Sequence, residues 1–268
     1  MTSAILLTGG TGTLGRLVAP RLLTAGAKLR VLSRQPREAG AAGAADDVEY
    51  VTGDLTTGEG AAAAVAGADV IVHCAGTSKG DDVKTRHLVD AATAAGNPHL
   101  VYISVVGADR TPVVSGLDRA MFGYVAAKHA SERIIADSGL PWTTLRATQF
   151  HELTLTTARA MARMPVLPAP SGFHIQPVAA AEVAERLAYL ALAEPAGLVE
   201  DMGGPHTYEM KDLLRSYLRA AGRRRPIVPV RLPGKAAAAF RGGANLAPDH
   251  AVGRDTWEDF LAERTAAG

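Results

Sequence analysis

The stretch "LLTGGTGTLGRLVAPRLL", residues 6–23, decides the fold of this protein. A short apolar run breaks into four glycines within seven residues. An amphipathic run follows, in which Leu14, Leu17, Val18 and Leu22 recur at helical spacing. The stretch therefore predicts a buried strand, a tight glycine turn and a helix. The reason why the turn carries no side chains at its glycines is the first indication of function.

Three of these glycines, Gly9, Gly12 and Gly15, have the spacing G-x-x-G-x-x-G between the predicted strand and helix. One glycine permits a tight turn at positive φ, another lets a pyrophosphate approach the backbone, and the third lets the helix pack on the sheet. The helix N-terminus adds free N–H groups and the positive end of its dipole. The pattern predicts a dinucleotide site, and the alternative is a turn with no ligand. The residues assigned to this part of the site are Gly9, Thr11, Gly12, Thr13, Leu14 and Gly15.

The end of the second predicted strand, "RVLSRQPR" at 30–37, indicates which dinucleotide binds. Sites that prefer NAD carry an acidic residue here for the ribose 2′-hydroxyl. This chain has Ser33 and Arg34 instead, with Arg37 close by, and a guanidinium suits a 2′-phosphate. We therefore expect NADP(H) to be favoured over NAD(H). Arg16 either assists or is an exposed helix cation.

Two later turns extend the predicted cofactor site. Asp54 and Leu55 follow the third strand, where Asp54 can accept a hydrogen bond from the adenine amino group or cap the next helix. The fourth strand ends in Cys74, Ala75 and Gly76, which are small enough for a ribose to lie close. Cys74 can equally be a small core residue.

The first part of the chain alternates short apolar runs with helical runs. The predicted strands are 4–8, 29–33, 48–52, 70–74, 100–105 and 142–147. Several are apolar throughout, which is typical of parallel strands that are buried on both faces. Repetition of strand and helix predicts an α/β fold with a Rossmann-type doubly wound parallel sheet.

The alternation loosens after about residue 150. Helices are predicted at 151–163, 180–192 and 211–221, around a proline-rich stretch at 164–178. We expect residues 1–150 to form the dinucleotide-binding core. Residues 151–268 are expected to form a small cap region that packs on the core and carries substrate specificity.

Composition excludes several classes of function. Of 268 residues, 28 are Lys or Arg and 27 are Asp or Glu, so the formal net charge of +1 gives no general attraction to nucleic acid or an anionic membrane. The single cysteine excludes an internal disulfide and a multi-cysteine metal site, and no metal is expected. The first residues lack the basic and apolar regions of a signal peptide. We expect a cytoplasmic monomer or homodimer that acts on a small molecule.

Four motifs resemble the short-chain dehydrogenase/reductase superfamily in order and spacing: "TGGTGTLG" at 8–15, "GDL" at 53–55, "HCAG" at 73–76 and "YVAAK" at 124–128. The stretches "YISVVGAD" at 102–109, "SGLPWTTLRATQFHE" at 138–152 and "QPVAAAEVAERL" at 176–187 resemble its atypical, NmrA-like branch. The resemblance covers most of the chain. That branch includes reductases of quinones and phenylpropanoids, isomerases and epimerases, and redox-sensing regulators that bind dinucleotide without turnover.

The resemblance implies a catalytic set. Tyr124 would donate a proton to the substrate oxygen, Lys128 would hold the nicotinamide ribose, and Ser104 would polarise the carbonyl. The alternative is a tyrosine and a lysine that share a helix face by chance. The turn after the sixth strand, with Gln149, Phe150 and His151, is the expected substrate pocket. His151 is either a general acid or base or a histidine without a catalytic role.

Together, the cofactor pattern and the resemblance predict an NADPH-dependent oxidoreductase that transfers a hydride to a small carbonyl, enone or quinone. Two other classes of function stay open. One is a dinucleotide-binding sensor without turnover, and the other is a non-redox isomerase, dehydratase or cyclase on the same fold.

Overall fold

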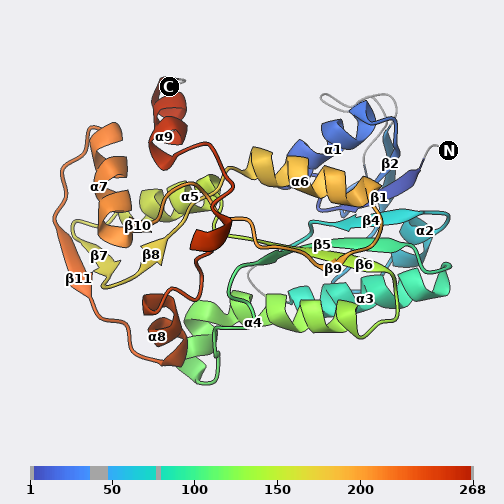
Figure 1. Ribbon diagram of the computed structural model, residues 1–268, viewed down its shortest axis with the longest axis horizontal. Helices are drawn as coiled ribbons and strands as arrows, with labels where there is room; N and C mark the ends of the chain where they lie inside the picture. The colour runs from blue at the N-terminus through green and yellow to red at the C-terminus, as the bar shows by residue number, and fades with distance from the viewer. Residues whose placement is uncertain (1–2, 37–47, 77–79, 267–268) are drawn as a thin grey trace. The chain divides into compact units, whose positions relative to one another are not determined.

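A seven-stranded sheet forms the centre of the nucleotide-binding part of the chain, in the order β3-β2-β1-β4-β5-β6-β9 (Figure 1). The computed structural model describes residues 3–36, 48–76 and 80–266. The strands are β1 (Ala4–Thr8), β2 (Lys28–Ser33), β3 (Val48–Thr52), β4 (Val70–His73), β5 (His99–Val105), β6 (Trp142–Ala147) and β9 (Gly197–Leu198). The order reverses between β1 and β4, as in a doubly wound sheet, and confirms the predicted fold class.

The register brings the strand ends together at one edge of the sheet. β1 pairs in parallel with both neighbours, so that Thr8 lies opposite Leu32 of β2 and His73 of β4. β2 also pairs in parallel with β3, which places Ser33 opposite Thr52. Because parallel strands end on the same side, the turns after β1, β2, β3 and β4 share this edge, where open α/β sheets bind their ligands.

Helices cover both faces of this sheet (Figure 1). α1 and α6 lie on one face, and α3 and α4 lie on the other. The helices are α1 (Gly15–Thr24), α2 (Ala61–Val65), α3 (Asp81–Ala94), α4 (Gly116–Ala136) and α6 (Ala180–Leu192). This double cover explains the continuous apolar runs of the sequence, because a strand with helices on both sides has no solvent-facing positions.

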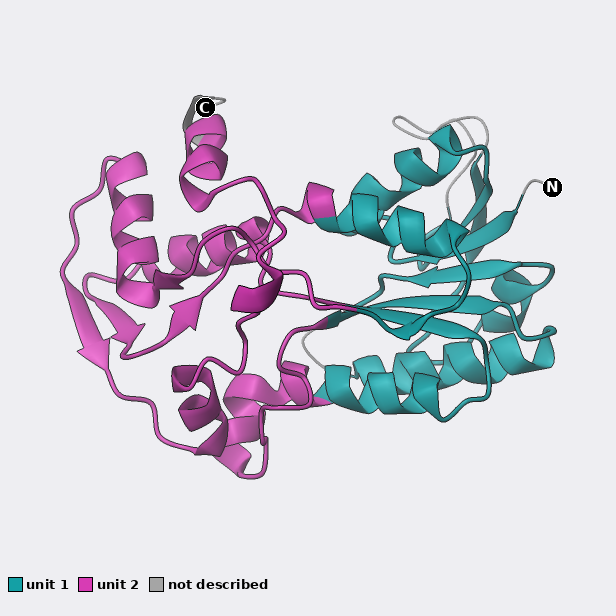
Figure 2. Cartoon of the chain, in the orientation of Figure 1, with its two compact units in different colours: residues 1–104, 127–145, 183–199 teal, residues 105–126, 146–182, 200–268 magenta. Residues whose placement is uncertain are grey.

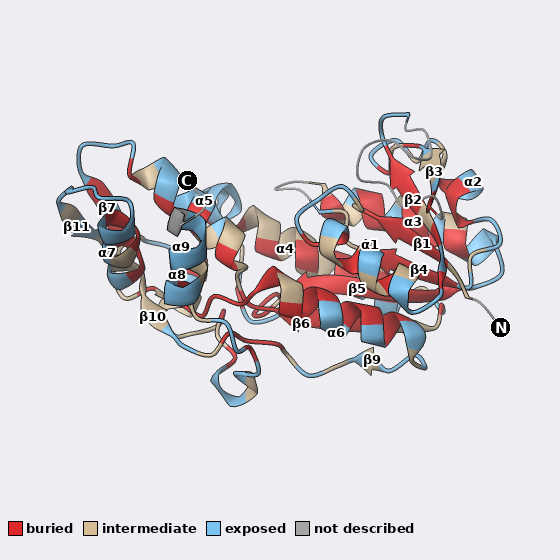
Figure 3. Ribbon diagram, turned by 90° about the horizontal axis from the view of Figure 1, so that it is seen from above, coloured by how far each residue is buried: buried red, intermediate tan, exposed pale blue. Residues whose placement is uncertain are grey.

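The core of the sheet is formed by buried apolar side chains. Most residues of the central strands are buried (Figure 3). Leu6 and Leu7, which point to opposite faces of β1, are both 0% exposed. On the side of α3 and α4, Leu6 belongs to a cluster with Leu88 of α3, Leu100 of β5 and Ile135 of α4. Burial of each such side chain contributes about 2 kcal/mol relative to exposure. The central strands are therefore a rigid base for the turns at their ends.

Two compact units divide the chain (Figure 2). Unit 1 comprises residues 1–104, 127–145 and 183–199 and holds the sheet, while unit 2 comprises residues 105–126, 146–182 and 200–268. The units interleave along the sequence because the chain returns to unit 1 to add the end of α4, most of β6, and then α6 with β9. The division of function between residues 1–150 and 151–268 stays a prediction.

Unit 2 has its own small core. Its elements are α5 (His151–Met161), β7 (Leu167–Pro170), β8 (His174–Ile175), β10 (Tyr208–Glu209), α7 (Met210–Ala220), β11 (Ile227–Val230), α8 (Lys235–Arg241), the 3-10 helix η1 (Pro248–His250) and α9 (Trp257–Ala266). β11 pairs in parallel with β7, and β10 pairs antiparallel with β8. Leu155, Leu213 and Trp257 pack in one buried cluster that joins α5, α7 and α9.

Candidate functional site

Two glycines of the turn after β1 are required by the fold itself. Gly9 has a positive φ of 70°, and a Cβ there would lie 2.6 Å from the backbone nitrogen of Ala75. A Cβ on Gly15, the first residue of α1, would lie 2.6 Å from Cα of Gly10 and would also strike the Gly9 carbonyl. These positions are bare because the turn folds on itself and against the end of β4.

Gly12 differs from the other two. It is exposed, and a Cβ there would meet a single group, the Gly9 carbonyl oxygen at 3.2 Å. Its own N–H donates to that carbonyl over 2.9 Å, and Arg16 Nε donates to the Thr11 carbonyl over 2.6 Å, so the loop is held in place. Close packing within the protein therefore explains why Gly9 and Gly15 have no side chain, whereas Gly12 is exposed to solvent.

The start of α1 suits an anion. Its N-cap residue, Leu14, makes no side-chain capping bond, and the first turn contains no acidic residue. Thr11 and Thr13 are exposed beside it, while Leu14 itself is buried. Helix N-terminal N–H groups with no competing carboxylate favour a bound phosphate. The residues of this turn therefore fit the pyrophosphate of a dinucleotide.

The turn after β2 presents Arg34 to solvent. Ser33 Oγ donates to the Gln35 carbonyl over 2.8 Å and accepts from the Gln35 N–H over 3.3 Å. Ser33 thus builds the turn and is itself buried, while Arg34 is exposed. Arg37, the second predicted arginine, lies outside the described residues.

The turn after β3 uses Asp54 locally. Asp54 Oδ1 accepts a hydrogen bond from the Thr56 N–H over 2.8 Å, and this bond lowers the pKa of the carboxyl below its usual range. Gly60, not Asp54, is the N-cap of α2. Asp54 therefore closes its own turn, and the predicted alternative role as a helix cap is wrong. Leu55 is buried in the sheet core, so only its backbone is available to a ligand.

The turn after β4 lies directly against the glycine turn. The Cys74 N–H donates to the Thr8 carbonyl over 3.1 Å, and the Ala75 N–H donates to Thr8 Oγ1 over 3.4 Å. Burial raises the pKa of the Cys74 thiol to about 12, so the side chain stays a neutral thiol. A Cβ on Gly76 would lie 3.4 Å from Lys128 Nζ, so this glycine leaves space beside that ammonium.

Lys128 is almost wholly buried, with 2% of its surface exposed. Its Nζ donates to the Ile103 carbonyl over 3.1 Å and lies 3.5 Å from Asp81 Oδ2. It also lies 4.8 Å from the ring centre of Tyr102. Lys128 therefore belongs to the floor of the site at the ends of β4 and β5, and Asp81, which the sequence analysis did not identify, is its acidic neighbour.

Ser104 lies near the end of β5, one residue after Ile103. Its side chain is 1% exposed, and its Oγ has no hydrogen-bond partner within the residues that the structure describes. A buried hydroxyl without a partner is uncommon and calls for a group to complete it. The role of Ser104 in polarising a substrate oxygen stays a prediction.

The other predicted residues belong to unit 2. Tyr124 is half-buried on α4, one helical turn before Lys128. Gln149 is half-buried, and its carbonyl accepts from the Val178 N–H over 2.9 Å. Phe150 is the N-cap of α5. Gln149 and Phe150 thus form a bridge to the segment before α6, which holds this turn in an extended conformation.

His151 is buried in the core of unit 2. It is 1% exposed, and its ring centre lies 5.0 Å from that of Phe260 and 6.1 Å from that of Trp257. Burial lowers the pKa of His151, which favours the neutral ring. These contacts give His151 a packing role in unit 2, and its predicted place in the substrate pocket stays a prediction.

Below the glycine turn, His73 connects β1, β4 and α3. Its Nδ1 lies 2.7 Å from Thr8 Oγ1, and its Nε2 lies 3.3 Å from Thr85 Oγ1. Its ring stacks on Tyr102 with centres 5.4 Å apart. Burial, assisted by the positive charges of Lys128 and Lys84, lowers the pKa of His73 to about 3. The histidine is therefore neutral and part of the support of the turn.

The burial of His73 makes folding sensitive to acid. Between pH 6.5 and about 3 the unfolded chain binds a proton at His73 that the folded chain does not bind. Stability should therefore fall as the pH drops below 6.5, by about 1.4 kcal/mol per pH unit from this group. Urea unfolding at pH 7 and pH 5 should show that the free energy of unfolding decreases less for His73→Gln than for the wild type. His206→Gln, at an exposed site, is the matched control, and an unchanged loss in His73→Gln would contradict the assignment.

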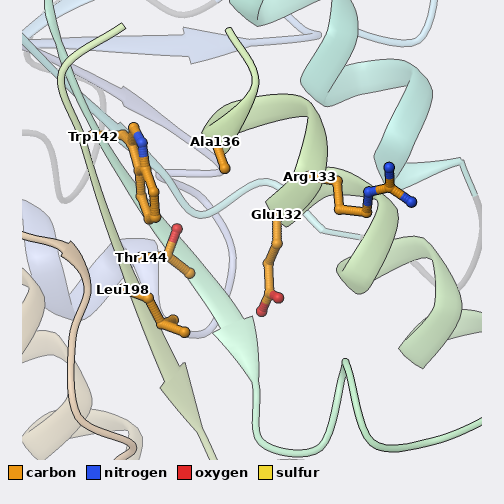
Figure 4. Close-up of a pocket in the computed structure, with 6 residues that line it drawn as sticks. All are labelled: Glu132, Arg133, Ala136, Trp142, Thr144 and Leu198. Carbon is orange, nitrogen blue, oxygen red and sulfur yellow. The ribbon is translucent and has the colours of Figure 1, made fainter. Parts of the chain in front are cut away.

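A small pocket lies on a different part of unit 1, between α4 and the strands β6 and β9 (Figure 4). Glu132 and Ala136 of α4 lie across from Trp142 and Thr144 of β6, while the Arg133 guanidinium turns away from them. The pocket has a volume of about 170 Å³, which is enough for a molecule of about the size of benzene. It is too small for a dinucleotide, whose predicted site is the row of turns at the carboxyl ends of the strands.

None of the helices in the described ranges is long and apolar enough to cross a membrane.

Comparison with known proteins supports the nucleotide site. A family model described as NAD(P)H-binding matches residues 9–194. The chain is 32% identical over 154 residues to (4-alkanoyl-5-oxo-2,5-dihydrofuran-3-yl)methyl phosphate reductase of Streptomyces griseus. The matched region covers 58% of this chain and 50% of that relative. It is also 26% identical over 230 residues to an uncharacterized protein of Mycobacterium tuberculosis, of which it covers 24%. The chain thus spans half or less of the length of these relatives.

Two solved structures share the fold over nearly the whole chain. The NADPH-dependent quinone oxidoreductase QOR2 of Escherichia coli, solved with NADPH, has a TM-score of 0.80 and 21% identity, and the match covers 97% of this chain and 99% of that one. The triphenylmethane reductase of Citrobacter sp., solved with NADP(H), has a TM-score of 0.74 and 19% identity over 98% of this chain and 99% of that one.

At these identities the two structures establish the fold, whereas the family model reaches from the glycine turn to the end of α6. The expectation of a dinucleotide-binding protein with this fold is confirmed. With more than half of its length matched, this chain belongs to the NAD(P)H-binding protein family.

Proposed function

We propose that this protein is an NADP(H)-dependent reductase that acts on a small carbonyl, enone or quinone. The observation that carries the proposal is the position of Lys128, whose buried ammonium lies beside the bare Gly76 at the end of β4. Tyr124 stands one turn earlier on the same helix. The Streptomyces reductase, the QOR2 oxidoreductase and the Citrobacter reductase all carry names of redox enzymes, which favours redox chemistry over the other classes.

The proposed cofactor contacts follow the turns of unit 1. The bare backbone at Gly12 and the N–H groups at the start of α1 would hold the pyrophosphate. Arg34, together with Arg37, would bind the 2′-phosphate, and Asp54 would accept a hydrogen bond from the adenine amino group. The turn of Cys74, Ala75 and Gly76 would lie along a ribose. Lys128 would bind the nicotinamide ribose.

When bound, NADPH supplies a hydride to the substrate. The contribution of the chain is to hold the substrate oxygen and to protonate it. In the proposed arrangement the buried Ser104 hydroxyl donates to that oxygen, and the Tyr124 hydroxyl gives up its proton as negative charge develops there. Gln149, Phe150 and His151 are proposed to belong to the substrate pocket.

The preference for NADP(H) is tested by a titration of wild type and Arg34→Ala with NADPH and with NADH, followed by fluorescence. We expect Arg34→Ala to weaken NADPH binding by about 30-fold, since a charge-assisted bond to a phosphate contributes roughly 2 kcal/mol. NADH affinity should stay within about twofold, because NADH has no 2′-phosphate. Arg186→Ala, which removes an exposed arginine of α6 that has no proposed cofactor contact, is the matched control. Equal losses for both nucleotides would contradict a specific role for Arg34.

The reaction class is tested by a screen of quinones, enones and small aldehydes with the preferred nucleotide, followed by the nicotinamide absorbance. Turnover of one of these substrates supports the reductase. Tight binding without turnover of any substrate would favour a sensor. Product formed at constant nicotinamide absorbance would favour isomerase, dehydratase or cyclase chemistry. A cytoplasmic location and a monomeric or homodimeric state stay predictions.

A further inference from the structure

We propose that Asp81 is a positioning residue, which holds the Lys128 ammonium at the point where it meets the nicotinamide ribose. This inference rests on the proposed function and deepens it. It assigns a role to an acidic residue that no motif of the chain marks, at the first position of α3.

Three separate elements converge on the ammonium. Lys128 reaches it from α4, the Ile103 carbonyl accepts from it over 3.1 Å at the end of β5, and Asp81 Oδ2 lies 3.5 Å away at the start of α3. A lysine side chain has a flexible four-carbon stem and no fixed direction of its own. Oxygens on two other elements give the ammonium one direction.

Asp81 is itself fixed. It is 0% exposed, and its other carboxylate oxygen, Oδ1, lies 3.5 Å from Lys84 Nζ, three residues further along α3. Its backbone carbonyl accepts from Thr85 Oγ1 over 2.8 Å. The first turn of a helix also favours a negative charge, because the positive end of the dipole lies there. The carboxylate is therefore held between two ammonium groups and cannot follow a moving lysine.

Both groups border the space that Gly76 leaves. A Cβ on Gly76 would lie 3.2 Å from Asp81 Oδ2 and 3.4 Å from Lys128 Nζ. The absence of a side chain here matters to the pair as well as to a ribose, because any larger residue would press on the carboxylate and the ammonium together. The ammonium is thus presented at the end of β4.

The chemistry explains why a carboxylate is needed. Burial of an ammonium is costly unless a counter-charge and hydrogen-bond acceptors surround it. The Ile103 carbonyl supplies an acceptor and Asp81 supplies the charge. Asparagine in place of Asp81 keeps the shape but removes the charge, so the lysine should lose its fixed direction. Contacts at the nicotinamide end should weaken, while contacts at the adenine end should not.

The test compares two ligands. NADPH reaches the nicotinamide ribose, whereas 2′,5′-ADP ends before it; NADH and ADP replace them if the wild type prefers NADH. We expect Asp81→Asn to weaken NADPH binding about tenfold and to leave 2′,5′-ADP within about twofold. Asp82→Asn removes the neighbouring acid of the same first turn and is the matched control, with both affinities close to those of the wild type.

A double-mutant cycle tests whether Asp81 acts through Lys128. If it does, Asp81→Asn should cause no further loss of NADPH affinity in a Lys128→Met background. If Asp81→Asn alone does not fold, Asp81→Asn/Lys84→Met removes one charge of each sign and should show the same selective loss. Additive losses, equal losses of both ligands, or an Asp81→Asn protein that binds NADPH like the wild type would each overturn the inference.

The outcomes separate this inference from the proposed function. If Lys128→Met loses NADPH affinity and Asp81→Asn does not, the inference fails and the role of Lys128 stands. If Lys128→Met binds NADPH like the wild type, or the wild type binds neither nucleotide, the cofactor assignment fails and the inference fails with it.

Discussion

Alanine at Gly12 is expected to weaken NADPH binding at least 30-fold while the free energy of unfolding stays within about 1 kcal/mol of the wild type. A Cβ on Gly12 would press on the Gly9 carbonyl oxygen at 3.2 Å, a contact that a small shift relieves. The φ of Gly12 is not in the left-handed region, so alanine can adopt the backbone conformation. Its methyl group would nevertheless occupy the outward side, where the pyrophosphate is proposed to lie.

Gly15 is the matched position for this experiment, because the same substitution there should fail for a different reason. A Cβ would lie 2.6 Å from Gly10 Cα and would strike the Gly9 carbonyl, so the turn must open to accept it. Such overpacking costs about 3 kcal/mol. We therefore expect Gly15→Ala to lose both stability and binding.

Thermal or urea unfolding, together with a fluorescence titration with NADPH, measures both quantities on both variants. The expected pattern is a binding defect without a stability defect for Gly12→Ala and a joint defect for Gly15→Ala. If Gly12→Ala binds NADPH as tightly as the wild type, the pyrophosphate does not lie over this turn, and the proposed cofactor contacts of α1 are wrong.

Phenylalanine at Tyr124 should lower kcat by about 100- to 1000-fold on whichever substrate the screen identifies, since general acid catalysis contributes on this scale. The substitution removes the hydroxyl and keeps the ring. NADPH affinity should change by less than about twofold, because the proposed cofactor contact on α4 is Lys128. A loss in kcat and in kcat/KM without a change in nucleotide affinity identifies a group that acts in the transition state.

Tyr189→Phe supplies the control for this change, because Tyr189 is exposed on α6 and has no proposed contact with cofactor or substrate. The substitution removes the same hydroxyl group and keeps the ring. Its kcat should match that of the wild type. If Tyr124→Phe also retains full kcat, the proton comes from another group, and the catalytic set implied by the family resemblance does not operate in this chain.

Much of the fold could be predicted from local sequence. The apolar runs of β1, β4 and β5 predicted strands that are buried on both faces. The order of the seven strands, which reverses between β1 and β4, confirms the doubly wound sheet. The short β9 and the short α2 were not predicted, because two or five residues are too few to show a period. β9 exists because β6 offers it a partner, not because its own residues favour a strand.

Some residues of the candidate site could likewise be identified from the sequence, and others could not. The turn from Gly9 to Gly15 could be recognised from spacing, and Arg34 is exposed after β2 as its position suggested. Asp54 could not be resolved from the sequence, because an aspartate in a turn satisfies a local N–H and a ligand equally well. His151 was selected for its place after β6, but its surroundings come from α9, over a hundred residues later in the chain.

The sequence by itself determined the fold class and the dinucleotide family, because strand and helix periodicity and the glycine spacing are properties of residues close together in the chain. The tertiary structure alone decided which glycines serve packing and which one faces outward. It alone also decided that His73 is buried between Thr8 and Thr85, and that Asp81 lies against Lys128. These are contacts between distant segments, and their geometry is fixed only when the helices pack on the sheet.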